Sequence, residues 1–261
     1  MNRRTYQFQG TFGLGGRTTY YVKKLLTLNI AIFILQLFIL LFFGEKGALL
    51  FNQTFGFAPS YFVQKYYFWQ PLTYMFLHGS LMHLIFNMFA LWMFGPDIEK
   101  YLGSKKFLTY YLVCGFGAVL FHFLAHYKGV SVPLTSQDQA IVVGASGAIF
   151  GLFGAHAYYF GNRMWMLIFP PIPIKARTLV IVMSAIELYY VLTQPGSPIA
   201  HLAHLGGLIV GLLYLYFWID RRKPPSAKSL LDKWRVRRLR KKFHVIRGSD
   251  VELDDKDYKW H

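Results

Sequence analysis

The stretch VVGASGAIFG, residues 142–151, carries one hydroxyl side chain, Ser146, among small and apolar residues. A serine hydroxyl is a weak nucleophile until a base removes its proton, and a neutral histidine is the usual base near pH 7. His204, in the stretch AHLGGLIVG, has the chemistry for that role. A serine can also sit in a helix by bonding its own backbone carbonyls, so Ser146 alone does not decide between helix packing and nucleophilic attack.

Attack on a carbonyl builds an oxyanion, which needs hydrogen-bond donors already in position. His83 and Asn87, in the stretch HGSLMHLIFN, are spaced i, i+4 and therefore share one face of a helix. They can donate from an imidazole and an amide. The backbone N–H of Ser146 can supply a third bond.

The elements that must position these residues are membrane helices. The 261 residues are 54% hydrophobic and 19% aromatic with only 15% charged, and the mean hydropathy is +0.32, outside the usual soluble range. A bilayer span needs roughly 20 apolar residues. The predicted spans are residues 25–43, 77–94, 107–125, 142–159, 178–192 and 199–219. They predict an all-α membrane protein with six transmembrane helices in one domain, 25–219.

The placement of charge predicts the orientation of the chain. With the N-terminus inside, 25 of the 28 Lys and Arg residues fall in inside segments, and only Lys46, Lys65 and Lys128 fall outside. This positive-inside asymmetry predicts that both termini are cytoplasmic, with an N-terminal segment, 1–24, and a basic tail, 220–261. We expect the tail to act as a topology anchor near anionic lipid, and we expect no nucleic-acid partner.

In this orientation the second, fourth and sixth spans begin in the outer leaflet, and costly polar residues collect there. At about 1.5 Å per residue, His83 and His204 lie about 7–9 Å inside their spans and Asn87 about 13–15 Å. Groups at similar depths on three parallel helices can meet. No carboxylate lies at the outer ends of these three helices, so we expect a Ser146–His204 dyad without an acidic partner.

Small residues provide a way to bring the serine and the imidazole together. The glycines concerned are Gly144, Gly147, Gly151, Gly207 and Gly211. Small residues spaced i, i+4 let helix backbones approach closely. Ser146 adjoins the glycine face of the fourth span, and His204 precedes that of the sixth span by about one turn. If the two faces pack together, the packing brings the Ser146 hydroxyl within hydrogen-bond reach of the His204 imidazole, which can then activate it.

The residues that metal-dependent and aspartyl proteases require are not found in their usual motifs. Cys114 is the only cysteine, which excludes an internal disulfide and a cysteine metal cluster. The motifs HExxH and GxGD do not occur, and we expect no metal and no cofactor. A histidine-rich metal-binding membrane protein stays open as an alternative, because His122 and His126 are also spaced i, i+4 near the outer side. His156 and Glu187 are interpreted as internal hydrogen-bond partners.

Four stretches together resemble the rhomboid family of intramembrane serine proteases. GASG around Ser146 resembles the GxSG nucleophile motif, AHLGGLIVG the AHxxG segment, HGSLMHLIFN the His and Asn pattern, and IEKYLGSKKF the ExxxGS stretch. They occur in order within residues 25–219. The resemblance implies a rhomboid-like bundle with Ser146 as nucleophile and His204 as general base and then acid. It also implies an oxyanion hole of His83, Asn87 and the Ser146 N–H.

The resemblance further implies that the substrates are transmembrane segments of membrane proteins, which enter between helices near the fifth span. Six spans without an extra helix fit a bacterial inner membrane. A rhomboid-like protein that binds clients without cutting them is a second alternative. Relatives of that kind lack the serine or the histidine, and both are present here.

Two positions depart from the family pattern. Gln70 follows Trp69 where the family commonly has Arg, so a loop contact of that Arg is lost. Phe150 stands where a Tyr often stacks on the catalytic histidine, and it keeps the ring without the hydroxyl. Glu99, after the second span, is expected to fix the inner loop by hydrogen bonds.

Overall fold

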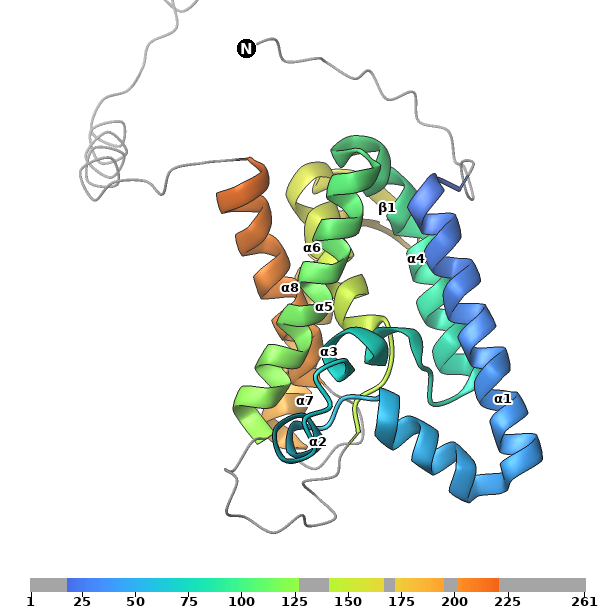
Figure 1. The fold of residues 1–261 in the computed structure, drawn as a ribbon. Coiled ribbons are helices and arrows are strands. Elements are labelled where there is room, and N and C mark those ends of the chain that lie inside the picture. The colour runs from blue at the N-terminus through green and yellow to red at the C-terminus, as the bar shows by residue number, and fades with distance from the viewer. Residues whose placement is uncertain (1–17, 127–140, 167–171, 195–200, 221–261) are drawn as a thin grey trace, which may run out of the picture. The chain divides into compact units, whose positions relative to one another are not determined.

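The computed structural model describes residues 18–126, 141–166, 172–194 and 201–220 (Figure 1). The chain divides into two compact units, Met1–Ile219 and Asp220–His261. The predicted basic tail, apart from Asp220, lies outside the described residues, as does most of the N-terminal segment 1–24.

The described part of the chain is mainly helical. Its elements are α1 (Tyr20–Phe55), α2 (Pro59–Gln64), α3 (Gln70–Thr73), the 3-10 helix η1 (Tyr74–Phe76), α4 (Leu81–Leu102), α5 (Ser104–His126), α6 (Ser146–Phe160), β1 (Met164–Met166), β2 (Pro173–Lys175), α7 (Ala176–Thr193), α8 (His201–Tyr214) and the π-helix η2 (Leu215–Ile219). The two short strands pair antiparallel, with Trp165 opposite Ile174. This small sheet was not predicted from the sequence.

The helical membrane fold predicted from hydropathy is confirmed. Among the described residues, five helices are long and apolar enough to cross a membrane: α1, α4, α5, α7, and α8 with η2. The fourth predicted span, 142–159, forms the shorter helix α6 of 15 residues, which is buried from Gly147 to His156. An enclosed helix need not match the thickness of the hydrocarbon layer. The count of six spans and the cytoplasmic termini stay predictions.

Helix α1 bends sharply at Gly44, where Figure 1 shows the chain turning into a second helical arm. Gly44 has φ 64° and ψ −167°, values outside the helical region. A positive φ is readily adopted by glycine and costly for residues with a Cβ. The first predicted span, 25–43, therefore ends at a true break, and the arm that follows belongs to the segment 44–76, the predicted outer segment.

Helices α6 and α8 approach each other through glycine. A Cβ on Gly207 would clash with the backbone carbonyl of Gly147, and a Cβ on Gly211 would lie 3.3 Å from the Gly151 Cα. Cys114 of α5 covers the same seam, 2.8 Å from the Gly211 Cβ position. Such contact between backbones is possible only where side chains are missing. The glycine-rich faces of the fourth and sixth predicted spans thus lie against each other.

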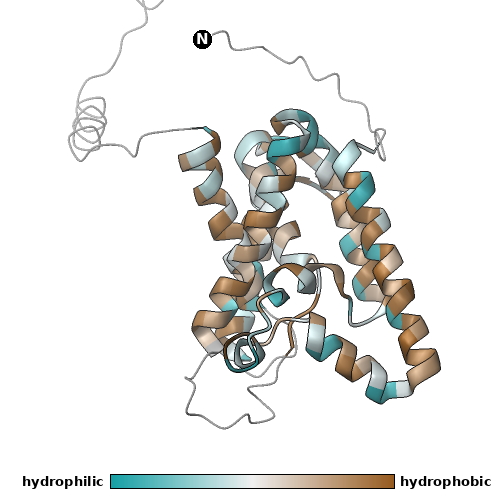
Figure 2. Ribbon diagram, in the orientation of Figure 1, coloured by the Kyte–Doolittle hydropathy of each residue, from teal (hydrophilic) through white to brown (hydrophobic). Residues whose placement is uncertain are grey.

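The residues of α1 are mostly hydrophobic, as the brown ribbon of Figure 2 shows, and many of them are exposed. The side chains of Leu41, Phe42 and Phe43 on α1 are each more than 70% exposed, and on α7 so is that of Leu192. Large contiguous apolar surfaces are unfavourable in water. Their presence on helices of this length is consistent with contact with lipid.

Glu99 of α4 fastens the beginning of α1. Its carboxylate accepts hydrogen bonds from the Thr19 hydroxyl at 2.5 Å and from the backbone N–H groups of Tyr21 and Val22, each at 3.0 Å. The first N–H groups of a helix have no partners within the helix and form its positive end, so a carboxylate there is stabilising. Glu99 was expected to fix the inner loop by hydrogen bonds. These contacts hold the start of α1.

We predict that Gly207→Ala lowers the unfolding free energy by about 1–3 kcal/mol, because the added methyl group forces α6 and α8 apart. Thermal unfolding in detergent measures the effect. Gly79→Ala is the matched control, since its Cβ would meet only Val143 at an ordinary 3.8 Å. Equal unfolding temperatures for the two variants would contradict the packing described above.

Candidate active site

Backbone hydrogen bonds from the outer segment fix the residues that lead into α6. Val142 exchanges two backbone hydrogen bonds with Phe57, at 2.8 and 2.9 Å, and the Gly144 N–H donates to the Tyr74 carbonyl at 2.9 Å. Gly144 has φ +120°, which side chains with a Cβ rarely adopt. These contacts set where Ser146, the first residue of α6, begins the helix.

Tyr74 is itself held firmly. Its hydroxyl donates to the Gly115 carbonyl of α5 at 2.7 Å, and the side chain is 1% exposed. Burial raises the pKa of Tyr74 well above its usual range, so the phenol stays protonated and remains a donor. The loop that positions Gly144 is thereby anchored to the helix bundle.

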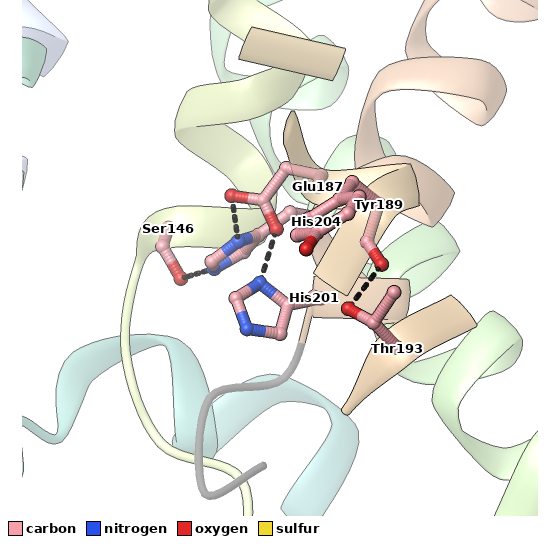
Figure 3. Close-up of polar contacts among 6 residues, drawn as sticks. All are labelled: Ser146, Glu187, Tyr189, Thr193, His201 and His204. Atoms are coloured by element: carbon pink, nitrogen blue, oxygen red, sulfur yellow. Dashed lines mark hydrogen bonds and ion pairs between the residues drawn. The ribbon is translucent and has the colours of Figure 1, made fainter. Parts of the chain in front are cut away.

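Ser146, the first residue of α6, and His204, on the first turn of α8, lie together, as Figure 3 shows. The His204 Nε2 is 2.8 Å from the Ser146 Oγ. The imidazole stacks on the Phe150 ring, with centroids 4.6 Å apart and planes inclined by 3°. Its side chain is 12% exposed. This geometry suits transfer of the serine proton to the imidazole.

A carboxylate from α7 completes the group. Glu187 Oε1 is 3.0 Å from His204 Nδ1, and Glu187 Oε2 is 2.6 Å from His201 Nδ1 (Figure 3). Among the described residues, His204 Nδ1 has no aligned hydrogen bond, and its 3.0 Å contact with Glu187 Oε1 is an ion pair when the imidazole is protonated. The expectation of a site without an acidic neighbour is therefore corrected.

Depth along the helix is a signal in the sequence that places Glu187 near the predicted level of His204, although depth does not tell which way the side chain faces. The fifth predicted span, 178–192, runs from inside to outside, so Glu187 lies five residues before its outer end, about 7 Å deep. His204 was expected at the same depth. The fifth predicted span thus carries a carboxylate at this depth, although it runs opposite to the second, fourth and sixth spans.

His83 and Asn87, the expected oxyanion donors, border the same space on α4. A Cβ on Gly144 would lie 2.7 Å from the His83 Nε2 and 3.8 Å from the Asn87 Nδ2. Asn87 is buried, and its amide donates to the His83 carbonyl at 3.0 Å. The hydroxyl of Ser80 caps α4 by accepting from the His83 N–H at 3.1 Å. Both donors are thus fixed beside the backbone that precedes Ser146.

The N-terminus of α6 contributes backbone donors. Ser146 begins this helix, and the bond from Ile149 N–H to the Ala145 carbonyl, 3.0 Å, closes its first turn. The N–H groups at the start of a helix have no partners within the helix and form the positive end of its dipole. An oxyanion beside Ser146 would meet this end.

A metal is one further possibility for the polar cluster. Glu187, His201 and His204 each offer a ligand atom, and these atoms lie within 4.8 Å of one another. The set of two histidines and one glutamate also occurs in zinc enzymes. Cys114, in contrast, lies in the apolar core of the bundle.

Gln70, which replaces the expected Arg, makes loop contacts of its own. Its side chain is fully buried. The amide donates to the Gln53 carbonyl at 2.8 Å and accepts from the Ala58 N–H at 3.2 Å. The outer segment is therefore tied together by a neutral side chain at this position.

Comparison with known proteins agrees with this architecture. The Rhomboid domain family matches residues 65–221, more than half of the chain, and the protein belongs to the rhomboid family. Family membership and the apolar helices make it an integral, multi-pass membrane protein.

Three relatives show the range of similarity. Rhomboid protease GluP of Bacillus subtilis is 34% identical over 188 residues, which cover 70% of this chain and 32% of GluP. Rhomboid protease GlpG of Yersinia pestis is 28% identical over 209 residues, 78% of this chain and 65% of GlpG. Rhomboid protein 1, mitochondrial, of Saccharomyces cerevisiae is 30% identical over 164 residues, which cover 63% of this chain and 43% of that protein. The chain spans less than two thirds of each of them.

We predict that Phe150→Leu slows labelling of Ser146 by a fluorophosphonate about two- to tenfold, because an aromatic stack is worth about 0.5–1.5 kcal/mol. Phe150→Tyr should label at nearly the parental rate, since it keeps the ring. The labelling rate of detergent-solubilised protein is measured. Equal rates for the Leu and Tyr variants would show that stacking does not orient His204.

Proposed function

We propose that the protein is an intramembrane serine protease that cleaves transmembrane segments of other membrane proteins. Ser146 is the nucleophile and His204 is the general base and then the general acid. The observation that carries the proposal is the 2.8 Å separation between His204 Nε2 and Ser146 Oγ. The rhomboid family, in which several relatives are named proteases, supports the same reaction class.

The reaction follows the order of acyl transfer. His204 Nε2 takes the proton of the Ser146 hydroxyl as Oγ bonds to the carbonyl carbon of the substrate and the carbonyl electrons move to its oxygen. When the tetrahedral intermediate collapses, the C–N bond breaks and Nε2 gives its proton to the leaving amine. Water then repeats the sequence on the acyl-enzyme and releases the second product.

The developing oxyanion is stabilised by His83, Asn87 and the backbone N–H of Ser146. These donors come from a fixed helix face and from the start of α6, so little reorganisation is needed during the reaction. The position of His83 Nε2 and Asn87 Nδ2 at the border of the space beside Gly144 supports this role. No metal or cofactor takes part in this scheme.

The substrate enters from lipid between the helices, near α7. The helix α7 has one buried residue, Ala176, and its other side chains are at least partly exposed. We further propose that the protein acts in a bacterial inner membrane and that its basic tail lies against anionic lipid. The excess of positive charge in the segments expected inside supports this orientation.

We predict that Ser146→Ala and His204→Ala each abolish cleavage of a transmembrane substrate while the protein still inserts and unfolds at its normal temperature. Shed ectodomains are compared by mass spectrometry between cells with the parental protein and cells with Ser146→Ala. Ser184→Ala is the matched control, because its hydroxyl only bonds the Val180 carbonyl of its own helix at 2.7 Å.

The other readings give different results in the same assay. Cleavage retained by Ser146→Ala would refute the proposal. Labelling of Ser146 without release of any client would favour a client-binding rhomboid that does not cut. Proteolysis should survive a chelator, whereas an activity lost on chelation would favour the metal-binding alternative.

We predict that Asn87→Ala lowers kcat about 10²-fold with little change in KM, the usual cost of losing one oxyanion donor. Initial rates on a purified substrate in proteoliposomes separate the two constants. A change in KM alone would assign Asn87 to substrate binding and remove it from the oxyanion hole.

A further inference from the structure

Glu187 stands in an unusual position for a charged residue. From Thr178 to Thr193 it is the single charged side chain of α7, and it is only 13% exposed. A carboxylate at membrane depth is expensive and needs compensating partners. Glu187 has two of them, both on the first turn of α8: Oε2 lies 2.6 Å from His201 Nδ1, and Oε1 lies 3.0 Å from His204 Nδ1 (Figure 3).

The two nitrogens of His204 face different groups. Nε2 is 2.8 Å from the Ser146 Oγ, and Nδ1, across the ring, faces the Glu187 carboxylate. To take the serine proton, Nε2 must be free of hydrogen, so the neutral ring must carry its proton on Nδ1. A carboxylate beside Nδ1 stabilises that tautomer, and it stabilises the imidazolium that forms when the proton arrives.

We propose that Glu187 is a positioning residue for the reaction, which holds His204 in the tautomer and orientation that a general base requires. This inference rests on the proposed protease function. The proton moves from Ser146 Oγ to His204 Nε2 and then to the leaving amine. Glu187 neither gains nor loses a proton, and it touches no reacting atom.

The distances favour this role over a metal site. Zinc binds its ligands at about 2.0–2.2 Å in tetrahedral geometry, which spaces neighbouring ligand atoms about 3.3 Å apart. The Glu187 oxygens lie closer than that to both histidines, at 2.6 and 3.0 Å. These are distances of direct pairing between a carboxylate and an imidazole.

Because Glu187 lies on α7, it couples the orientation of the His204 imidazole to the position of a third helix. Ser146 and His204 belong to α6 and α8, which are joined through their glycines, whereas Glu187 belongs to α7. Because Ala176 is the only buried residue of α7, this helix is held less tightly than its neighbours. The base is therefore fully oriented only when α7 lies against α8.

The test compares kcat, KM and the rate of fluorophosphonate labelling for Glu187→Gln and Glu187→Asp. Glu187→Gln removes the charge with little change of shape. We expect kcat and the labelling rate to fall about 10²-fold with KM within about twofold, below the about 10⁴-fold loss seen where the acid is a fully aligned triad member. Glu187→Asp, which keeps the charge, should recover part of the rate.

Two control variants test whether the effect of Glu187→Gln depends on its place beside His204. Glu45→Gln makes the same substitution at an exposed site of α1 and should leave the rates unchanged. Ser184→Ala removes another polar group of α7, whose hydroxyl donates to the Val180 carbonyl at 2.7 Å, and should also leave the rates unchanged. Unfolding temperatures show whether each variant folds, and Glu187→Asp supplies the measurement if Glu187→Gln does not.

Three outcomes would overturn the inference. A folded Glu187→Gln that labels at the parental rate would show that the carboxylate is not needed. Equal losses in Glu187→Gln and Glu187→Asp, matched by lower unfolding temperatures, would leave only a structural tie between α7 and α8. Activity that is lost with a chelator and restored by Zn²⁺ would assign the cluster to a metal. Failure of the protease proposal itself is recognised separately, by cleavage that survives Ser146→Ala.

Discussion

The close approach of α6 and α8 is the constraint on which the rest of the structure depends. Gly207 lies so near the Gly147 carbonyl that no side chain fits between the two helices, and Gly211 faces Gly151 one turn further on. The distance between two helix axes is set by the side chains at their contact. With glycine there, the hydroxyl on the first residue of α6 reaches the imidazole on the first turn of α8 without a long side chain.

Polar groups in a membrane persist where they satisfy one another, and this site is built on that rule. Ser146, His204, Glu187 and His201 form one chain of close contacts that draws on three helices. Around it, the outer segment fixes the backbone before α6 through Phe57 and Tyr74, and Phe150 covers the face of the imidazole. The site is thus rigid on the side of α6 and α8. On the side of α7 it depends on one carboxylate.

That asymmetry fits a reaction whose substrate arrives from lipid. A helix with few buried side chains can separate from the bundle at low cost, since little packing is lost. If α7 moves, the glycine contacts that join Ser146 to His204 are unaffected, but Glu187 moves with its helix. In the proposed reaction, Ser146 and His204 then stay paired, and the orientation of His204 responds to whatever occupies the space beside α7.

Much of this protein was determined by the sequence alone. Hydropathy located the helices, depth along them grouped Ser146, His204, His83 and Asn87, and the spacing of glycines indicated which faces meet, because all three depend on residue type and on the fixed rise of a helix. Only the tertiary structure decided the bend at Gly44, the short enclosed form of α6 and the pairing of Glu187 with both histidines. Which way a side chain faces around a loosely patterned helix such as α7 depends on the neighbours that the helix finds after folding, and no local pattern records them.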